Sequence, residues 1–157
     1  MHTIFITGGT GCIGSVTIYK LLQSKEVGKI VVATRSNNTD PLKLWLGKAL
    51  DARIEFVKLD VADYDAIEAV VTKVNPTHII HLGAYQSPDC SKYHIPGMEI
   101  NTGGTMALFD VAEKLPNLKR FVFASSAAVY GIRAMYPEPG ITEDAQLAPP
   151  NHYGIWK

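Results

Sequence analysis

Short apolar runs alternate with amphipathic segments along the whole of this chain. The runs are rich in β-branched and aromatic residues, as is typical of strands that are buried on both faces. We predict strands at residues 3–6, 29–34, 53–59, 77–82 and 118–124. In the segments between them, apolar residues recur at the three- and four-residue intervals of helices that cover a sheet.

The segments between the strands also carry helix boundaries. Asp40-Pro41 and Asp63 stand where helices begin, and Asn75-Pro76 stands where one ends. We predict helices from the first glycines to Leu22, over residues 41–50, from Asp63 to Val74 and from Ile100 to Leu115, with a loop holding Pro88 and Pro96 before the last of them.

Strands and helices that alternate in this way form a doubly wound parallel α/β sheet with right-handed crossovers. A chain of 157 residues has the length of one ordinary domain, so residues 1–157 are treated as one unit with its own core. Ligands of such sheets lie at the carboxyl ends of the strands. We therefore expect the functional residues to cluster just after each strand.

The stretch that organises the chain is residues 7–14, Thr-Gly-Gly-Thr-Gly-Cys-Ile-Gly, here called the glycine turn. A predicted strand precedes it and a predicted helix follows it, so the helix offers N–H groups and a positive dipole end to a pyrophosphate. Gly9, Gly11 and Gly14 have the spacing of the Rossmann-type dinucleotide loop, and Gly8 with the last two gives a variant of it. The alternative is a flexible turn without a ligand.

The residues after the second strand bear on the choice of cofactor. NAD sites usually have an acid there, which binds the adenosine ribose hydroxyls, but this chain has Thr34 followed by Arg35. An arginine can hold a 2′-phosphate through charge-assisted hydrogen bonds. The sequence therefore predicts NADP, with NAD less favoured. The alternative is that Arg35 stacks on the adenine or points into solvent.

Tyr153 and Lys157 place a phenol and an ammonium four residues apart, on one face of a predicted helix. A nearby ammonium lowers the pKa of a phenol from its ordinary value of about 10, so that the phenol can exchange a proton with a carbinol. This spacing is common in structural helices. The spacing supports a catalytic role here because the chain also has the glycine turn and Ser125 and Ser126, a polar pair directly after the fifth strand.

Taken together, these motifs resemble the extended short-chain dehydrogenases/reductases, the NAD(P)-dependent epimerase/dehydratase family. The resemblance runs the whole length of the chain in the family's order, and it rests on the glycine turn and on residues 58–61, 81–84, 101–105, 123–131 and 153–157. It implies a Rossmann-type domain, a nicotinamide cofactor and a sugar or nucleotide sugar as the small-molecule substrate.

The resemblance also implies which residues bind the cofactor. The N–H groups of Cys12 and Ile13 in the glycine turn would bind the pyrophosphate. Further along the chain, the adenine would be bordered by Asp60 and Val61, the path to the nicotinamide ribose lined by Leu82, Gly83 and Ala84, and the adjoining loop supported by Asn101. For Asp60 the alternative is to cap the start of the helix ahead of Asp63.

For the reaction, the resemblance implies that Ser126 bonds the reacting oxygen and that Tyr153 is the acid/base. Lys157 would lower the pKa of this tyrosine and bind the nicotinamide ribose. Family dehydratases carry an adjacent Asp and Glu where this chain has Ala127 and Ala128. Neither alanine can move a proton, so dehydration of that type is disfavoured.

The leading hypothesis is therefore an NAD(P)-dependent oxidoreductase that transfers hydride at a carbinol or ketone carbon of a sugar or nucleotide sugar. One alternative is an epimerase, which needs the same residues, and another is a non-catalytic module that senses the cofactor. Family members continue past the lysine into a substrate domain. We therefore expect residues 1–157 to be the dinucleotide-binding part of a larger protein and to be inactive by themselves.

Charge and composition narrow the partners. The chain has 15 basic and 15 acidic side chains, which gives no electrostatic reason to expect nucleic acid or a membrane as a partner. No leader or membrane-spanning run is expected. Two cysteines form no disulfide framework, and five histidines lack metal-ligand spacing, so we expect no metal site and a cytoplasmic location. The oligomeric state stays open, with a homodimer as one option for the full-length protein.

Overall fold

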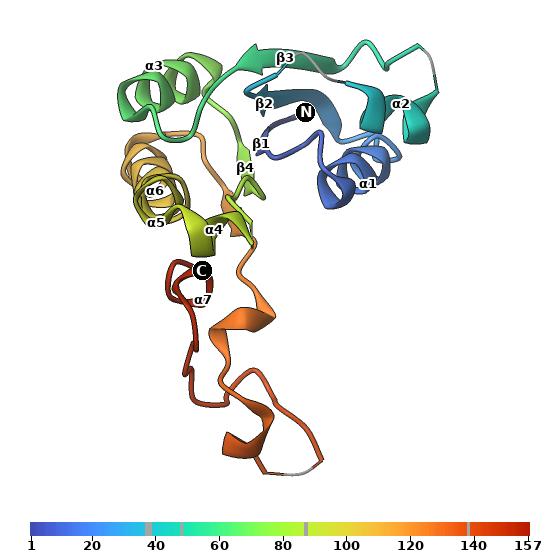
Figure 1. Cartoon of the computed structure of the whole chain (residues 1–157). Helices are drawn as coiled ribbons and strands as arrows, with labels where there is room; N and C mark the ends of the chain where they lie inside the picture. Colours follow the sequence, from blue (N-terminus) through green and yellow to red (C-terminus); the bar gives the residue numbers. More distant parts are fainter. Residues whose placement is uncertain (37–38, 48, 87, 138) are drawn as a thin grey trace.

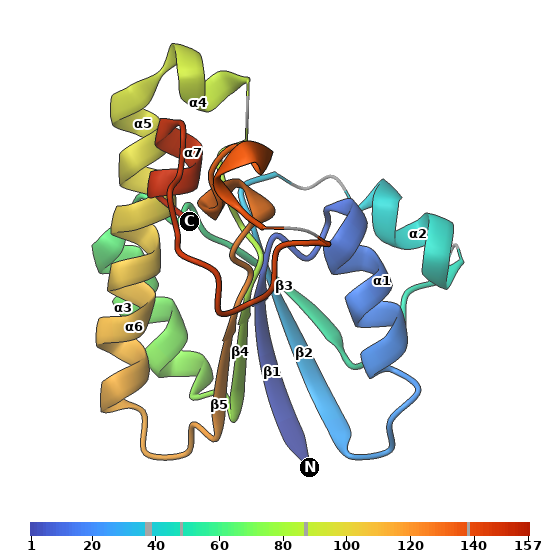
Figure 2. The same cartoon turned by 90° about the horizontal axis from the view of Figure 1, so that it is seen from below.

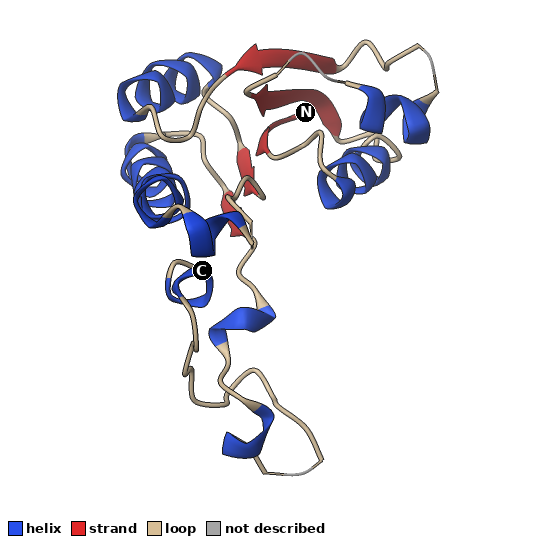
Figure 3. Ribbon diagram, in the orientation of Figure 1, coloured by secondary structure: helices blue, strands red, loops and turns tan. Residues whose placement is uncertain are grey.

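The computed structural model describes residues 1–36, 39–47, 49–86, 88–137 and 139–157. Its centre is a five-stranded sheet in the order β3-β2-β1-β4-β5, with neighbouring strands parallel (Figures 1 and 3). The strands are β1 (His2–Thr7), β2 (Val27–Thr34), β3 (Ile54–Lys58), β4 (His78–His81) and β5 (Arg120–Phe123). Each lies within two residues of its predicted ends, and the predicted doubly wound sheet is confirmed.

Helices cover both faces of this sheet (Figure 2). One face carries α1 (Cys12–Leu21) and α2 (Asp40–Leu46), and the other carries α3 (Tyr64–Val74) and α6 (Gly104–Lys114). No helix in the described ranges is both long and apolar enough to cross a bilayer.

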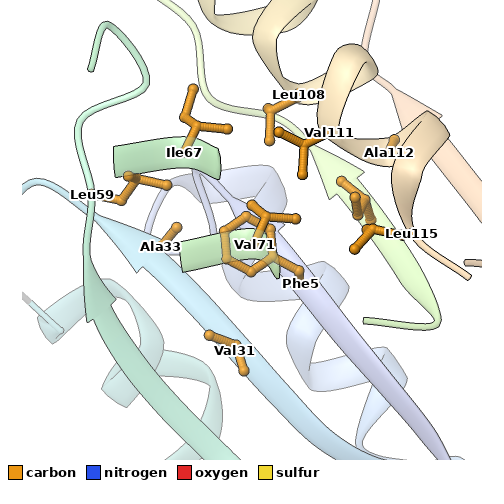
Figure 4. Close-up of a cluster of buried hydrophobic side chains, with 11 residues drawn as sticks. Phe5, Val31, Ala33, Leu59, Ile67, Val71, Leu108, Val111, Ala112 and Leu115 are labelled. Atoms are coloured by element: carbon orange, nitrogen blue, oxygen red, sulfur yellow. The ribbon is translucent and has the colours of Figure 1, made fainter. Parts of the chain in front are cut away.

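The alternation of side chains along the central strands produces two separate cores. Ile4 and Ile6 of β1 pack with Ile18 of α1 on one face. Phe5, which lies between them, packs on the other face with Val71 and other residues of α3 and α6 (Figure 4). Because both faces are covered, most positions of β1 and β2 are buried, which explains their continuous apolar runs in the sequence.

Two predictions about the helices are wrong. The helix predicted over residues 41–50 ends at Leu46, because Gly47 adopts a non-helical backbone conformation with a positive φ (+83°). Residue 48 lies outside the described residues. The loop predicted around Pro96 contains two short helices, α4 (Asp89–Lys92) and α5 (His94–Met98). Pro96 is accommodated because it lies in the first turn of α5, where its missing N–H would have no helical partner.

After β5 the chain leaves the sheet and then returns. The segment that projects from the sheet (orange in Figure 1) holds two short 3-10 helices, η2 (Ala127–Val129) and η3 (Arg133–Met135). It ends in α7 (His152–Ile155), which lies beside α4 and α5. The ring of Trp156 packs on Gly97 of α5, where a side chain would collide with it. This return brings the end of the chain back to the carboxyl side of the sheet.

Arg53 anchors the start of β3 to the end of α1. Its guanidinium donates to the carbonyl oxygens of Leu22 (2.9 Å) and Val27 (3.1 Å) and forms a bidentate pair with Asp51 (3.0 and 2.9 Å). The side-chain hydrogen bonds from Arg53 lower the pKa of Asp51 to about 2. The folded state therefore gains stability from the Asp51 carboxylate above its ordinary pKa of 3.8 and loses it as the pH falls towards 2.

We expect the free energy of unfolding of the wild-type protein to decrease as the pH is lowered from about 4 to 2. In the Asp51→Asn variant this decrease should be smaller. The variant should also be less stable at pH 7, because Arg53 loses its charged partner. Urea unfolding at a series of pH values measures both effects. The matched control is Glu113→Gln, which replaces an exposed carboxylate on α6. Parallel pH profiles for Asp51→Asn and the wild type would contradict the prediction.

Candidate functional site

The glycine turn lies at the carboxyl end of β1, the central strand. Gly8 has a φ of +68°, and a side chain there would lie 2.7 Å from the backbone nitrogen of Gly83. Gly14 is buried in the first turn of α1, where a side chain would collide with the carbonyl of Gly8 and the Cα atom of Gly9. Glycine at these positions therefore allows β1, β4 and α1 to approach one another closely.

α1 begins at the glycine turn without a side-chain cap. Gly11 is its N-cap residue, and the Gly11 carbonyl accepts hydrogen bonds from the N–H and the hydroxyl of Ser15. The N–H groups of Cys12 and Ile13, in the first turn, have no intrahelical acceptors. Both residues are exposed, so this end of α1 is free to donate to an anion.

A cavity of about 560 Å³ opens beside the glycine turn, across the carboxyl ends of β1 to β4. It brings together residues that are far apart in the sequence. Eight of the predicted cofactor-binding residues line it: Gly8, Gly11, Arg35, Asp60, Val61, Leu82, Gly83 and Ala84. Cys12, Ile13 and Gly14 stand next to it in α1 rather than in its wall.

The charges of the cavity wall come from two neighbouring strands. Among the described residues that line it, Arg35 after β2 is the cation and Asp60 after β3 is the anion. Thr34 occupies the place where NAD sites usually have an acid, and its hydroxyl donates to the Ser36 carbonyl (2.8 Å). The described wall after β2 therefore offers a positive charge and no carboxylate to the ligand.

The N-cap residue of α3 is Asp63 rather than Asp60. The Asp63 side chain accepts a hydrogen bond from the Ala66 N–H (3.0 Å). The Asp60 carboxylate accepts from the Ala62 N–H (3.0 Å) in the turn before the helix. It remains exposed at the cavity.

Asn101 lies behind the cavity and supports its wall. α5 continues into α6 through a π-helical turn, η1 (Glu99–Gly103), in which Ile100 lines the cavity while Asn101 is buried. The Asn101 side chain accepts from the Tyr85 N–H (2.6 Å) and donates to the Tyr85 carbonyl (2.9 Å). The Cys90 thiol donates to the same carbonyl (2.6 Å), and burial raises the pKa of this thiol. These bonds fix the wall around Tyr85.

Ser126 precedes η2, Tyr153 lies in α7 and Lys157 follows α7, and these two short helices pack on each other. Gly154 makes this packing possible, because a side chain there would collide with the Ala128 carbonyl. The Ser125 hydroxyl donates to the carbonyl of Lys157 (3.0 Å). The loop after β5 and the end of the chain are therefore held together.

The side chains of these three residues do not bond to one another, as far as the described residues show. The Ser126 hydroxyl oxygen accepts from the Ala128 N–H (3.1 Å), and the Lys157 ammonium lies 4.5 Å from the centre of the Phe123 ring. Burial lowers the pKa of Lys157. α7 ends at Ile155, two residues before Lys157, and so short a helix has little stability of its own. The shared helical face of Tyr153 and Lys157 therefore stays a prediction.

Several residues of the cavity were not predicted. Tyr85 and Gln86 follow β4 and line the cavity, whereas Ser87 lies outside the described residues. Thr7, the first residue of the glycine turn, also lines it, as does Ile100, which no motif in the sequence marks. Within the described ranges, no group of three His, Cys, Asp or Glu side chains could hold a metal ion.

A family model described as GDP-mannose 4,6 dehydratase matches residues 5–157 of the chain. The chain belongs to the extended short-chain dehydrogenase/reductase family. This short-chain dehydrogenase/reductase is 34% identical over 161 residues to UDP-glucose 4-epimerase 3 from Oryza sativa subsp. japonica, an alignment that covers 99% of the chain and 42% of that protein.

Solved structures share this fold. The UDP-Glc/GlcNAc 4-epimerase from Campylobacter jejuni matches with a TM-score of 0.83 and 24% identity, over 100% of this chain and 46% of that one. The Bordetella bronchiseptica enzyme WbmG in complex with NAD and UDP matches with a TM-score of 0.78 and 28% identity, over 98% of this chain and 46% of that one. The chain thus spans less than half of the length of these relatives.

Proposed function

We propose that this short-chain dehydrogenase/reductase binds a nicotinamide dinucleotide in the cavity and that the full-length protein transfers hydride at a carbinol or ketone carbon of a sugar or nucleotide sugar. The observation that carries the proposal is the cavity that joins the glycine turn to the ends of β2, β3 and β4. Its volume lies within the usual range of small-molecule sites. Residues 1–157 would be the dinucleotide-binding part of that protein.

Each part of the dinucleotide has candidate partners. The uncapped N–H groups of Cys12 and Ile13 would bind the pyrophosphate, which the helix dipole also favours. Asp60 and Val61 would border the adenine. The path to the nicotinamide would be lined by Leu82, Gly83 and Ala84, next to the loop that Asn101 supports.

Arg35 favours NADP over NAD, because it would form charge-assisted hydrogen bonds with a 2′-phosphate where Thr34 replaces the usual acid. We expect Arg35→Ala to weaken NADP binding by about ten- to a hundredfold, the loss of one or two such bonds, and to leave NAD binding unchanged. Calorimetric titration with both nucleotides measures this. The control is Arg120→Ala, at the opposite end of the sheet. An equal loss for both nucleotides would mean that Arg35 contacts the adenine instead.

The chemistry would be a paired transfer of a proton and a hydride. When bound, the nicotinamide accepts or supplies the hydride. Tyr153 would take the proton from the carbinol oxygen, or return it, while Ser126 donates a hydrogen bond to that oxygen. Lys157 would stabilise the ionised tyrosine once α7 is long enough to bring both side chains to one face.

A nucleotide sugar is supported as the substrate by the names of the relatives, which include a UDP-glucose 4-epimerase and an enzyme solved with NAD and UDP. The matching family model is described as a dehydratase, but Ala127 and Ala128 stand where family dehydratases carry an Asp and a Glu. Dehydration lacks its acid and base here. Epimerisation is the second candidate, because several of the relatives that the chain matches are UDP-glucose 4-epimerases.

The test is turnover of UDP-glucose by the full-length protein with NADP or NAD at less than one equivalent per substrate. Net oxidation stops when the added cofactor is consumed, with reduced nucleotide visible by absorbance. Epimerisation continues to the equilibrium of the two epimers without net change in absorbance. Dinucleotide binding without turnover of any nucleotide sugar would instead support the cofactor-sensing module.

A further inference from the structure

His81 is buried at the carboxyl end of β4, and the proposed function gives it no role. In the sheet it is the register partner of Thr7 at the end of β1. Its Nδ1 atom lies 2.6 Å from the Thr7 hydroxyl oxygen, and its Nε2 atom lies 3.0 Å from the hydroxyl oxygen of Thr105 in α6. One imidazole therefore joins β1, β4 and α6.

The partners of the two threonines determine which ring nitrogen carries the hydrogen. The Thr105 hydroxyl donates to the carbonyl of Asn101 (2.6 Å), so its oxygen can only accept from His81, and Nε2 must be the donor. In a neutral ring Nδ1 is then an acceptor, and Thr7 donates to it. The Thr7 oxygen in turn accepts from the Gly83 N–H (3.0 Å).

The surroundings of the ring keep it neutral. Burial, with a smaller contribution from the charge of Lys157, lowers the pKa of His81 to about 4. One neighbour is Phe123, whose ring stacks on the imidazole with 5.7 Å between the ring centres. The Lys157 ammonium lies 4.5 Å from the centre of the same phenylalanine ring. His81 therefore stays in one protonation state at neutral pH, and its hydrogen bonds keep one direction.

We propose that His81 is a positioning residue of the dinucleotide cavity, which holds the glycine turn and the wall around Tyr85 at a fixed separation. At one end of the chain of bonds, Thr7 precedes Gly8 and binds the Gly83 N–H. At the other end, Thr105 holds the backbone of Asn101, whose side chain binds both backbone groups of Tyr85. The role in binding a dinucleotide rests on the proposed function, whereas the linkage itself does not.

Two variants separate the ends of this linkage. An asparagine amide at position 81 can reproduce the contact of Nδ1 with Thr7 but is too short to reach Thr105, and a glutamine does the reverse. We expect His81→Gln to speed amide hydrogen exchange at Gly83 by about tenfold, the equivalent of one hydrogen bond, with Tyr85 unchanged. His81→Asn should speed exchange at Tyr85 and leave Gly83 unchanged.

Nitrogen NMR of the wild-type protein tests the tautomer directly. The expected spectrum has the hydrogen on Nε2 and shows no titration of His81 between pH 8 and pH 5. Dinucleotide affinity is the functional measurement, made by calorimetric titration with NADP. We expect His81→Asn and His81→Gln each to bind NADP about tenfold more weakly than the wild type. His81→Phe, which retains a ring but loses the hydrogen bonds to both threonines, should bind NADP more weakly still.

A hydrogen on Nδ1 would overturn the linkage. So would a Gly83 amide and a Tyr85 amide that each exchange at the same rate in the folded wild-type, His81→Asn and His81→Gln proteins. Unchanged NADP affinity in both variants would overturn its role in the cavity. If His81→Phe does not fold, the Asn and Gln variants still decide the question. A wild-type protein that binds no dinucleotide would overturn the proposed function, and the exchange rates would still report on the linkage.

Discussion

Tyr153→Phe is expected to lower kcat of the full-length protein by ~10²–10⁴-fold, the usual effect of removing a general acid/base. Phenylalanine retains the ring that packs in α7 but cannot exchange a proton with the carbinol oxygen. Dinucleotide affinity should be unchanged, because Tyr153 does not line the cavity in the described part of the chain. Steady-state turnover of a nucleotide sugar and calorimetric titration with NADP measure the two effects separately.

Tyr19→Phe is the matched control for Tyr153→Phe. Tyr19 belongs to α1, on the other face of the sheet, and its ring contacts Trp45. The same chemical change there should leave kcat at the wild-type value. Equal kcat values for Tyr153→Phe and the wild type would refute the acid/base role of Tyr153.

Gly14→Ala is expected to weaken dinucleotide binding by at least about tenfold and to lower the thermal midpoint of unfolding. The added methyl group would collide with the carbonyl of Gly8 and lie 2.6 Å from the Cα atom of Gly9. Since these are backbone atoms, they can move only if the glycine turn moves, and overpacking of this kind costs about 1–3 kcal/mol. Differential scanning calorimetry and titration with NADP measure stability and affinity on the same sample.

Gly140→Ala serves as the control, because among the described residues no atom beyond its chain neighbours lies within 4 Å of the added carbon, and Gly140 has no positive φ. Its thermal midpoint should be unchanged or slightly raised, since alanine restricts the unfolded chain. Gly14→Ala with wild-type affinity and stability would mean that the close approach of α1 to the glycine turn is not needed for binding.

The fold could be predicted because its signals are local. Each strand is a short apolar run and each long helix has a periodic apolar face, so neighbouring residues carry the pattern. The misplaced boundaries have local causes that the pattern does not contain. Gly47 ends α2 by its backbone conformation, and Pro96 fits into a first turn that looked like a loop.

The cofactor-binding residues could be predicted for a similar reason. In a parallel sheet the carboxyl ends of all strands lie at one edge, so residues that directly follow strands meet there. Gly8, Arg35, Asp60 and Gly83 follow four different strands and line one cavity. The family motifs supply the same residues, which is why the two lines of reasoning agree.

By itself, therefore, the amino-acid sequence determined the order of the elements, the parallel sheet and the edge at which the functional residues gather. Only the tertiary structure decided how that edge is held. The bonds of His81 to Thr7 and Thr105, and of Asn101 to Tyr85, join residues 16 to 74 positions apart. Strand register and helix packing decide which of these distant side chains meet. Neither property can be inferred from the residues that are adjacent in the sequence.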